Sequence, residues 1–288
     1  VPGDLDAHRV PSAARSPHIP PRAENAAGWA HPDRRKTALA VVYLHGFSAS
    51  RQETAPLSDE IAQQLGANLY YPRLNGHGRS GAAMAEASVN AWLNDTEEAL
   101  QIGQRLGERV LVVATSTGAT LATWLATQPH SDKVLAYALI SPNFAPKDPA
   151  AQVLTWPWAK HFVPLLLGTE HQWQPRNAEQ ARYWNHRYPV QALLPMMGLV
   201  EYVRELPLES IQAPLLVIYS PEDKVVSPAA TEQAFARFGS PHKQLLALAD
   251  TQDDSHHVLA GRVLSPRDTP RVEEAILQFL KPLLGAQP

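Results

Sequence analysis

Three kinds of side chain that can together perform nucleophilic chemistry stand where separate apolar segments of this chain end. Ser116 follows the apolar run 110–114, and Asp223 follows another such run. Two histidines, His256 and His257, lie between the last apolar run and the C-terminal segment. An imidazole can remove the proton of a serine hydroxyl, and a carboxylate can orient that imidazole and stabilise its charged form. These residue types therefore predict a serine nucleophile that attacks an acyl carbon.

The serine lies in Ala114-Thr115-Ser116-Thr117-Gly118, between a predicted buried strand and a helix-forming segment. A hydroxyl at such a sharp turn stands above the sheet, and small neighbours such as Gly118 and Ala114 let the helix cross close to the strand. The alternative is that Ser116 only caps the following helix, because serine is a common N-cap.

Two backbone amides are candidates for binding a developing oxyanion. The N–H of Thr117 lies at a predicted helix N-terminus, where amides lack intrahelical acceptors. His45-Gly46-Phe47 ends the first strong strand, so the N–H of Phe47 can supply a second donor at the same edge. Removing one donor of this kind typically costs about 2.7–4 kcal/mol of transition-state stabilisation.

The residues leave two choices open for the acid and the base. Asp223 directly follows a strand, but an aspartate there can also be a turn residue that bonds its own backbone, and Glu222 is adjacent. Either His256 or His257 can be the base. The order Ser, Asp, His along the chain is the α/β-hydrolase order, which differs from the orders of chymotrypsin-like and subtilisin-like enzymes.

Apolar runs and helix-forming segments alternate along most of the chain, which favours an α/β fold with a mostly parallel sheet flanked by helices. Residues 1–37 are rich in Pro and Ala and predict an extended N-terminal arm. Residues 38–142 and 211–288 predict the core, and residues 143–210 a mostly helical cap inserted into it. The strands are expected at 39–44, 68–72, 110–114, 134–140, 214–219 and 243–248, and the helices at 53–65, 90–106, 117–127, 228–238 and 269–284.

The inserted segment is crowded with large apolar side chains. If it roofs the site, these side chains form an apolar pocket suited to an acyl chain or a hydrophobic ester. The alternatives are that they only hold the cap to the sheet, or that they extend the core. The candidate pocket residues are Trp156, Trp158, Phe162, Trp184 and Met196.

The chain resembles the α/β-hydrolase superfamily, in particular its monoacylglycerol-lipase-like and carboxylesterase-like branch, which overlaps the serine aminopeptidase group. In such relatives the catalytic histidine stands immediately before a small aliphatic residue, which favours His257 over His256. The histidine of a Gly-His-Gly loop, here His77, is structural in these relatives. The segments that carry the resemblance are His45-Gly46-Phe47, Asn75-Gly-His-Gly-Arg-Ser80, Thr115-Ser116-Thr117-Gly118, Pro221-Glu-Asp223 and His257-Val258.

This resemblance implies a serine hydrolase that cleaves carboxylic esters, such as monoacylglycerols, through an acyl-enzyme on Ser116. A serine aminopeptidase or amidase of the same fold is the first alternative, and a non-catalytic binding protein that keeps the fold is the second. Haloalkane dehalogenases and epoxide hydrolases are disfavoured because those relatives have Asp at the nucleophile position. Two departures stand out: Ala114 replaces the usual first glycine of the turn, and the Pro-rich arm replaces the usual early antiparallel strands.

Composition excludes several other classes of protein. The formal net charge is −3 with no basic stripe, so no nucleic-acid partner is expected. No apolar run approaches the roughly 20 residues that span a bilayer. The chain has no cysteine, no Gly-rich nucleotide loop and no His-Glu-x-x-His spacing, so no metal and no cofactor are expected. The acidic cluster at 250–254 is interpreted as solvated. The first residue, Val1, slightly favours an exported protein, and the oligomeric state stays open.

Overall fold

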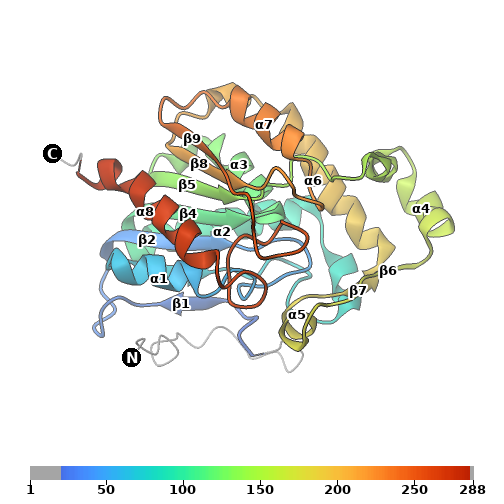
Figure 1. The fold of residues 1–288 in the computed structure, drawn as a ribbon, viewed down its shortest axis with the longest axis horizontal. Coiled ribbons are helices and arrows are strands. Elements are labelled where there is room, and N and C mark those ends of the chain that lie inside the picture. Colours follow the sequence, from blue (N-terminus) through green and yellow to red (C-terminus); the bar gives the residue numbers. More distant parts are fainter. Residues whose placement is uncertain (1–20, 286–288) are drawn as a thin grey trace.

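The computed structural model describes residues 21–285, which are organised around one seven-stranded sheet with the strand order β1-β3-β2-β4-β5-β8-β9 (Figure 1). β1 pairs antiparallel with β3, and every other neighbouring pair in this sheet is parallel. The predicted fold class is confirmed. The strands are β1 (Ala26–Gly28), β2 (Thr37–Leu44), β3 (Asn68–Tyr71), β4 (Gly107–Thr115), β5 (Val134–Ile140), β8 (Leu215–Tyr219) and β9 (Lys243–Ala247).

Helices cover both faces of this sheet (Figure 1). One face packs against α1 (Leu57–Gln64) and α8 (Thr269–Gly285), and the other against α2 (Val89–Leu106), α3 (Thr117–Ala126) and α7 (Pro228–Arg237). Successive side chains of a strand point to opposite faces, so both sets of residues in a central strand must be apolar. In β2, Val41 and Tyr43 pack on the α1–α8 side, while Val42 and Leu44 pack on the α2–α3 side.

The N-terminal part of the core differs from the expectation in two places. Residues 1–20 of the predicted arm lie outside the described residues, but within the remainder Ala26–Gly28 adds an edge strand to the sheet. The helix expected at 53–65 begins only at Leu57, because residues 51–56 form turns. Glu53 therefore lies in a loop, and its side chain is buried rather than displayed on a helix.

The segment 143–210 leaves the sheet after β5 and returns before β8. It contains a small antiparallel ribbon that the sequence did not predict, because each strand has only three residues and a single one of the six, Tyr188, is buried. In Figure 1, α4 lies farthest from the central sheet. The elements are α4 (Ala159–Leu167), β6 (Glu170–Gln172), α5 (Ala178–Tyr183), β7 (Arg187–Pro189) and α6 (Leu193–Glu205), with 3-10 turns at Pro149–Thr155, Val190–Ala192 and Leu208–Ser210.

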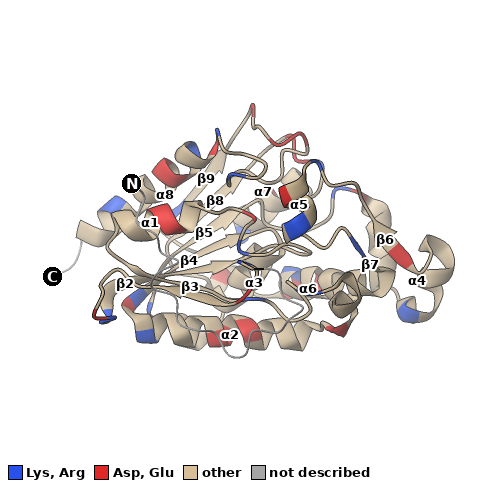
Figure 2. Cartoon of the chain, turned by 90° about the horizontal axis from the view of Figure 1, so that it is seen from below, with Lys and Arg blue, Asp and Glu red and all other residues tan. Residues whose placement is uncertain are grey.

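Positions of Lys and Arg and positions of Asp and Glu are both spread along the ribbon in Figure 2, with no large region of one sign. Among the helices of residues 21–285, none combines the length and the apolar character needed to cross a membrane.

The start of α3 lies very close to the backbone at the end of β2. A Cβ on Gly118 would lie 2.2 Å from the carbonyl oxygen of Leu44 and 2.6 Å from that of His45. Both are backbone atoms of β2 or of the residue after it, so they cannot rotate away as a side chain would. Only glycine permits α3 to start this near to β2, which is the reason the turn around Ser116 needs a small residue here.

We expect Gly118→Ala to lower the free energy of unfolding by at least about 1–3 kcal/mol, because the added methyl overlaps fixed backbone atoms. The matched control is Gly198→Ala inside α6, where the new Cβ would meet only Val89 Cγ2, at 3.7 Å. That variant should gain about 0.5–1 kcal/mol from helix propensity. Denaturant unfolding of both variants measures the difference, and equal stabilities would contradict the close crossing.

Candidate active site

Ser116 occupies a strained turn between β4 and α3. Its backbone has φ 52° and ψ −118°, a region that L-residues rarely adopt. Its carbonyl accepts hydrogen bonds from the N–H groups of Ala119 (2.9 Å) and Thr120 (3.1 Å), so the backbone of Ser116 begins the helix. Its hydroxyl makes no capping hydrogen bond to α3. The structure therefore favours the nucleophile interpretation of Ser116 over the N-cap alternative.

Three side chains from distant parts of the sequence form one hydrogen-bonded row. The Oγ of Ser116 lies 3.0 Å from Nε2 of His257, and Nδ1 of His257 lies 2.8 Å from Oδ2 of Asp223. Since an ionised carboxylate can only accept, Nδ1 is assigned the proton and Nε2 the lone pair that faces the serine. The other carboxylate oxygen, Oδ1, accepts from the N–H groups of Val225 (2.7 Å) and Val226 (2.9 Å), which fixes its orientation.

The neighbouring candidates point elsewhere. The side chain of Glu222 is 59% exposed, and its carboxylate lies 3.7 Å from Nδ1 of His256. His256 lies 2.8 Å from the Thr251 hydroxyl through the same nitrogen. Ser116 and His257 are each 7% exposed, so the row is enclosed without being sealed. Of the two choices left by the residues, the structure brings Asp223 and His257, and not Glu222 and His256, to the serine.

The loop that carries His257 is held by a second aspartate. Oδ2 of Asp253 accepts from the N–H groups of His257 and Val258, both at 3.1 Å, and also from the hydroxyl of Ser255. Its Oδ1 lies 2.9 Å from the guanidinium of Arg176, in the segment 143–210. Burial works against the charged carboxyl, but these donors and Arg176 lower the pKa of Asp253 below its ordinary value. The base is thus anchored to the inserted segment as well as to the core.

Charges around His257 favour its protonated form. Burial opposes the imidazolium, but the carboxylates of Asp223, Glu53 and Asp253 outweigh burial and raise the pKa of His257 above 6.5. A base of raised pKa accepts the serine proton more readily, although it must first be neutral to do so.

The two predicted oxyanion donors lie close to Ser116 along the chain or across the sheet. Thr117 is the first residue of α3 and Phe47 follows the end of β2. For neither N–H do we find an acceptor within residues 21–285. Both amides are therefore free to meet an oxyanion beside Ser116.

Aromatic rings pack behind the Phe47 amide. The Phe47 ring makes edge-on contacts with Tyr188 at 5.5 Å and with His77 at 5.7 Å between ring centroids. Burial lowers the pKa of His77 to about 3 and that of His45 to about 4, so both imidazoles are neutral near pH 7. His77 is thus a neutral packing residue in this structure, in line with the structural role that the resemblance implies.

The five candidate pocket residues are distributed unevenly. Trp156 and Trp158 are 59% and 76% exposed, while Phe162 is half-buried and packs against the cluster that includes residues of α4 and α6. Trp184 packs with Ala49 and Val258, next to the base. Sδ of Met196 lies 3.2 Å from the side-chain Nδ2 of Asn143, and the backbone N–H of Asn143 donates to the carbonyl of Ser116. Trp184 and Met196 therefore lie nearest to the row.

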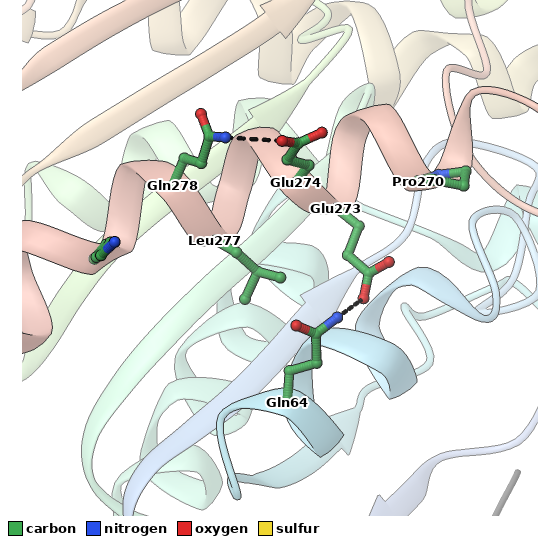
Figure 3. Close-up of a pocket in the computed structure, with 7 residues that line it drawn as sticks. Gln64, Pro270, Glu273, Glu274, Leu277 and Gln278 are labelled. Atoms are coloured by element: carbon green, nitrogen blue, oxygen red, sulfur yellow. Dashed lines mark hydrogen bonds between the residues drawn. The ribbon is translucent and has the colours of Figure 1, made fainter.

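A separate hollow lies between α1 and α8 (Figure 3). It is lined by polar side chains such as Gln64, which donates to Glu273 at 2.6 Å, and Gln278, which donates to Glu274 at 2.8 Å. None of its lining residues belongs to the hydrogen-bonded row. In the part of the chain that the structure describes, no group of three or more His, Asp or Glu side chains gathers as a metal site would.

A parallel sheet with helices on both faces, a serine at a strained strand-to-helix turn and a Ser–His–Asp row define an α/β-hydrolase. Comparison with known proteins agrees with that class. The family described as "Serine aminopeptidase, S33" matches residues 35–252, and the chain therefore belongs to this family of serine hydrolases. The resemblance noted from the motifs is confirmed.

Individual relatives are distant in sequence. A thermostable monoacylglycerol lipase from Bacillus sp. (strain H-257) is 25% identical over 241 residues, which cover 84% of this chain and 90% of that protein. A solved structure from work on LipS and LipT, two metagenome-derived lipolytic enzymes, has a TM-score of 0.74 at 24% identity, covering 91% of this chain and 99% of the other. The crystal structure of a monoacylglycerol lipase from Paleococcus ferrophilus has a TM-score of 0.66 at 17% identity, and the match covers 90% of this chain and 98% of the other.

Several residues that shape the site were not identified from the sequence. Glu53 was assigned to the first turn of a helix, where an acidic residue needs no further explanation. Asp253 was noted only as part of a solvated acidic loop, and Arg176 carried no signal at all. Their roles depend on contacts between segments far apart in the chain, which no local pattern encodes.

We expect His257→Ala to slow the labelling of Ser116 by a fluorophosphonate roughly 10⁴-fold or more, since the variant lacks the base that activates the hydroxyl. The control is His256→Asn. His256 has a positive φ of 55°, and asparagine tolerates that backbone. His256→Asn should label within about twofold of the wild type. Labelling that depends on His256 instead would overturn the assignment of the base.

Proposed function

We propose that this protein hydrolyses hydrophobic carboxylic esters through an acyl-enzyme on Ser116. The observation that carries the proposal is the continuous row from Ser116 Oγ through His257 to Asp223, at 3.0 and 2.8 Å, beside two free amides. Support for an ester as substrate comes from the relatives whose names describe monoacylglycerol lipases.

In the first half of the proposed reaction, Nε2 of His257 takes the proton of Ser116 as Oγ attacks the acyl carbon. The N–H groups of Phe47 and Thr117 donate to the resulting oxyanion. The imidazolium then gives its proton to the leaving alkoxide, and the acyl group stays on Oγ. Asp223 keeps the imidazole in the right tautomer and stabilises its charge throughout.

In the second half, a water molecule takes the place of the alcohol. His257 removes a proton from the water, which attacks the acyl carbon, and the same proton returns to Oγ as the acid leaves. The inserted segment 143–210, acting as a cap, brings Trp184 and Met196 to the vicinity of the row. These apolar side chains favour an acyl chain over a charged substrate.

An aminopeptidase is the second candidate, because the matching family carries that description. Such an enzyme needs a free carboxylate to bind the amino terminus of its substrate. Three acidic residues of the cap are already paired: Glu170 with Arg187, Glu179 with Arg262 and Glu209 with Arg237. Glu201 and Glu205 make no such ion pair within residues 21–285, but they line a hollow that includes none of Ser116, His257 and Asp223. The ester is therefore favoured because no unpaired carboxylate of this set is found beside the row.

Hydrolysis of p-nitrophenyl esters of graded chain length, run beside amino-acid p-nitroanilides, separates the two candidates. We expect turnover of the esters, with kcat/KM rising for longer acyl chains, and little cleavage of the anilides. Ser116→Ala should reduce ester turnover about 10⁴-fold or more. Cleavage of the anilides alone would favour the aminopeptidase, and an unlabelled, inactive wild type would indicate a non-catalytic protein.

The pH dependence of kcat/KM should report the protonation of His257. Because the base must be neutral and its pKa is raised, activity should rise with pH and reach half its maximum above pH 6.5. Asp223→Asn removes the adjacent negative charge, so the acid limb should move to lower pH, and the rate should fall roughly 10⁴-fold. If the low-pH fall of kcat/KM stays at the same pH in this variant, that fall does not report the protonation of His257.

A further inference from the structure

A second carboxyl group, that of Glu53, lies behind the candidate oxyanion donors. Glu53 belongs to the turns between β2 and α1 and is only 3% exposed. Its Oε2 accepts from the N–H of Gly46 at 2.7 Å and from the hydroxyl of Tyr43 at 3.0 Å. The reaction described above does not use this group.

Three hydrogen bonds of Gly46 determine where the Phe47 amide points. The N–H of Gly46 is held by Glu53, and its carbonyl lies 2.9 Å from Nδ1 of His45 and accepts from the N–H of Ala49 at 3.3 Å. The carbonyl of Gly46 and the N–H of Phe47 belong to the same planar peptide unit, so they turn together. The Gly46 N–H belongs to the preceding peptide unit, so Glu53 fixes one side of this freely rotating glycine, while His45 and Ala49 hold the unit that carries the Phe47 N–H.

The carboxyl group also packs directly against the backbone of Gly46. A Cβ on Gly46 would lie 2.7 Å from Oε1 of Glu53 and 3.2 Å from Cβ of Ser116. At this place Gly46 has only a hydrogen on its Cα, and that hydrogen lies between the carboxyl of Glu53 and the side chain of Ser116. These distances place the carboxyl one glycine away from Ser116.

A second connection leads from Glu53 to the nucleophile turn. The Tyr43 hydroxyl that donates to Glu53 also lies 3.2 Å from Oγ1 of Thr115, the residue before Ser116. The loop after His257 closes over the same turns, because Arg262 donates its N–H to the carbonyl of Ala55 at 2.9 Å. Three parts of the site thus meet around one buried carboxyl.

We propose that Glu53 is a positioning residue for the ester hydrolysis proposed above: it orients the Phe47 donor through Gly46 and supplies negative charge behind His257. The second role follows from the electrostatics of the buried site. The charged groups that face the imidazole are Asp223, Asp253 and Glu53, and each favours the imidazolium that forms during acylation.

The protonation of Glu53 itself should matter near neutral pH. Burial raises its pKa to about 7, against the opposing effects of the Gly46 N–H, the imidazole of His257 and the Tyr43 hydroxyl. Below that pH the carboxyl gains a proton and loses its charge. Its support for the imidazolium then disappears together with part of its capacity to accept hydrogen bonds.

Glu53→Gln and Glu53→Asp separate charge from geometry, with Glu60→Gln on α1 as the control. Glutamine keeps an acceptor near Gly46 but removes the charge, so kcat should fall about tenfold or more with KM within about twofold, and the acid limb should move to lower pH. Aspartate keeps the charge but is too short to reach Gly46, so kcat should fall while the acid limb stays near the wild-type position. A tenfold loss is part of the 10²–10³ that a whole oxyanion donor contributes to kcat.

The kinetics are measured on a p-nitrophenyl ester, together with the thermal midpoint of each variant. Wild-type kcat and acid limb in Glu53→Gln, or wild-type kcat in Glu53→Asp, would overturn the proposal. A loss of activity in both variants that follows the thermal midpoint, with KM raised and the acid limb unmoved, would reduce Glu53 to a structural residue. A wild type that neither labels nor hydrolyses esters would instead overturn the proposed function.

Discussion

The parallel alignment of β3, β2, β4, β5, β8 and β9 places the carboxyl ends of six strands along one edge of the sheet. Every part of the candidate site follows from this constraint. Ser116 follows β4, Asp223 follows β8, and His257 lies in the long loop beyond β9. Parallel strands need long crossover connections, so residues separated by 141 and 34 positions become hydrogen-bond partners.

Much of this arrangement could be predicted from the sequence, and the reason is physical. A strand buried on both faces has a continuous apolar sequence, so β4 and β5 can be predicted from the sequence. A polar residue just after such a run is then predicted to lie at the carboxyl ends of the strands, where the site forms. The choice of His257 over His256 needed the family resemblance. What escaped prediction depends on tertiary contact: the inward turn of Glu53, the ion pair of Asp253 with Arg176, and the ribbon of β6 and β7, which buries Tyr188.

The site concentrates negative charge around one buried imidazole. Asp223, Asp253 and Glu53 all raise the pKa of His257, and isolated buried carboxylates are costly. Backbone amides offset that cost: Asp223 and Asp253 each accept two N–H groups, and Glu53 accepts one. The loops therefore have to adopt the shapes that present these amides, which ties their conformation to the catalytic charges.

The backbone conformation of Ser116 lowers the stability of the fold. A conformation with φ 52° and ψ −118° costs of the order of 1–3 kcal/mol in any residue that has a Cβ. Glycine adopts it freely, so the most stable sequence for this fold has no hydroxyl at position 116. The stability of the fold therefore does not explain a serine at this position, whereas a role for its hydroxyl in the proposed reaction does.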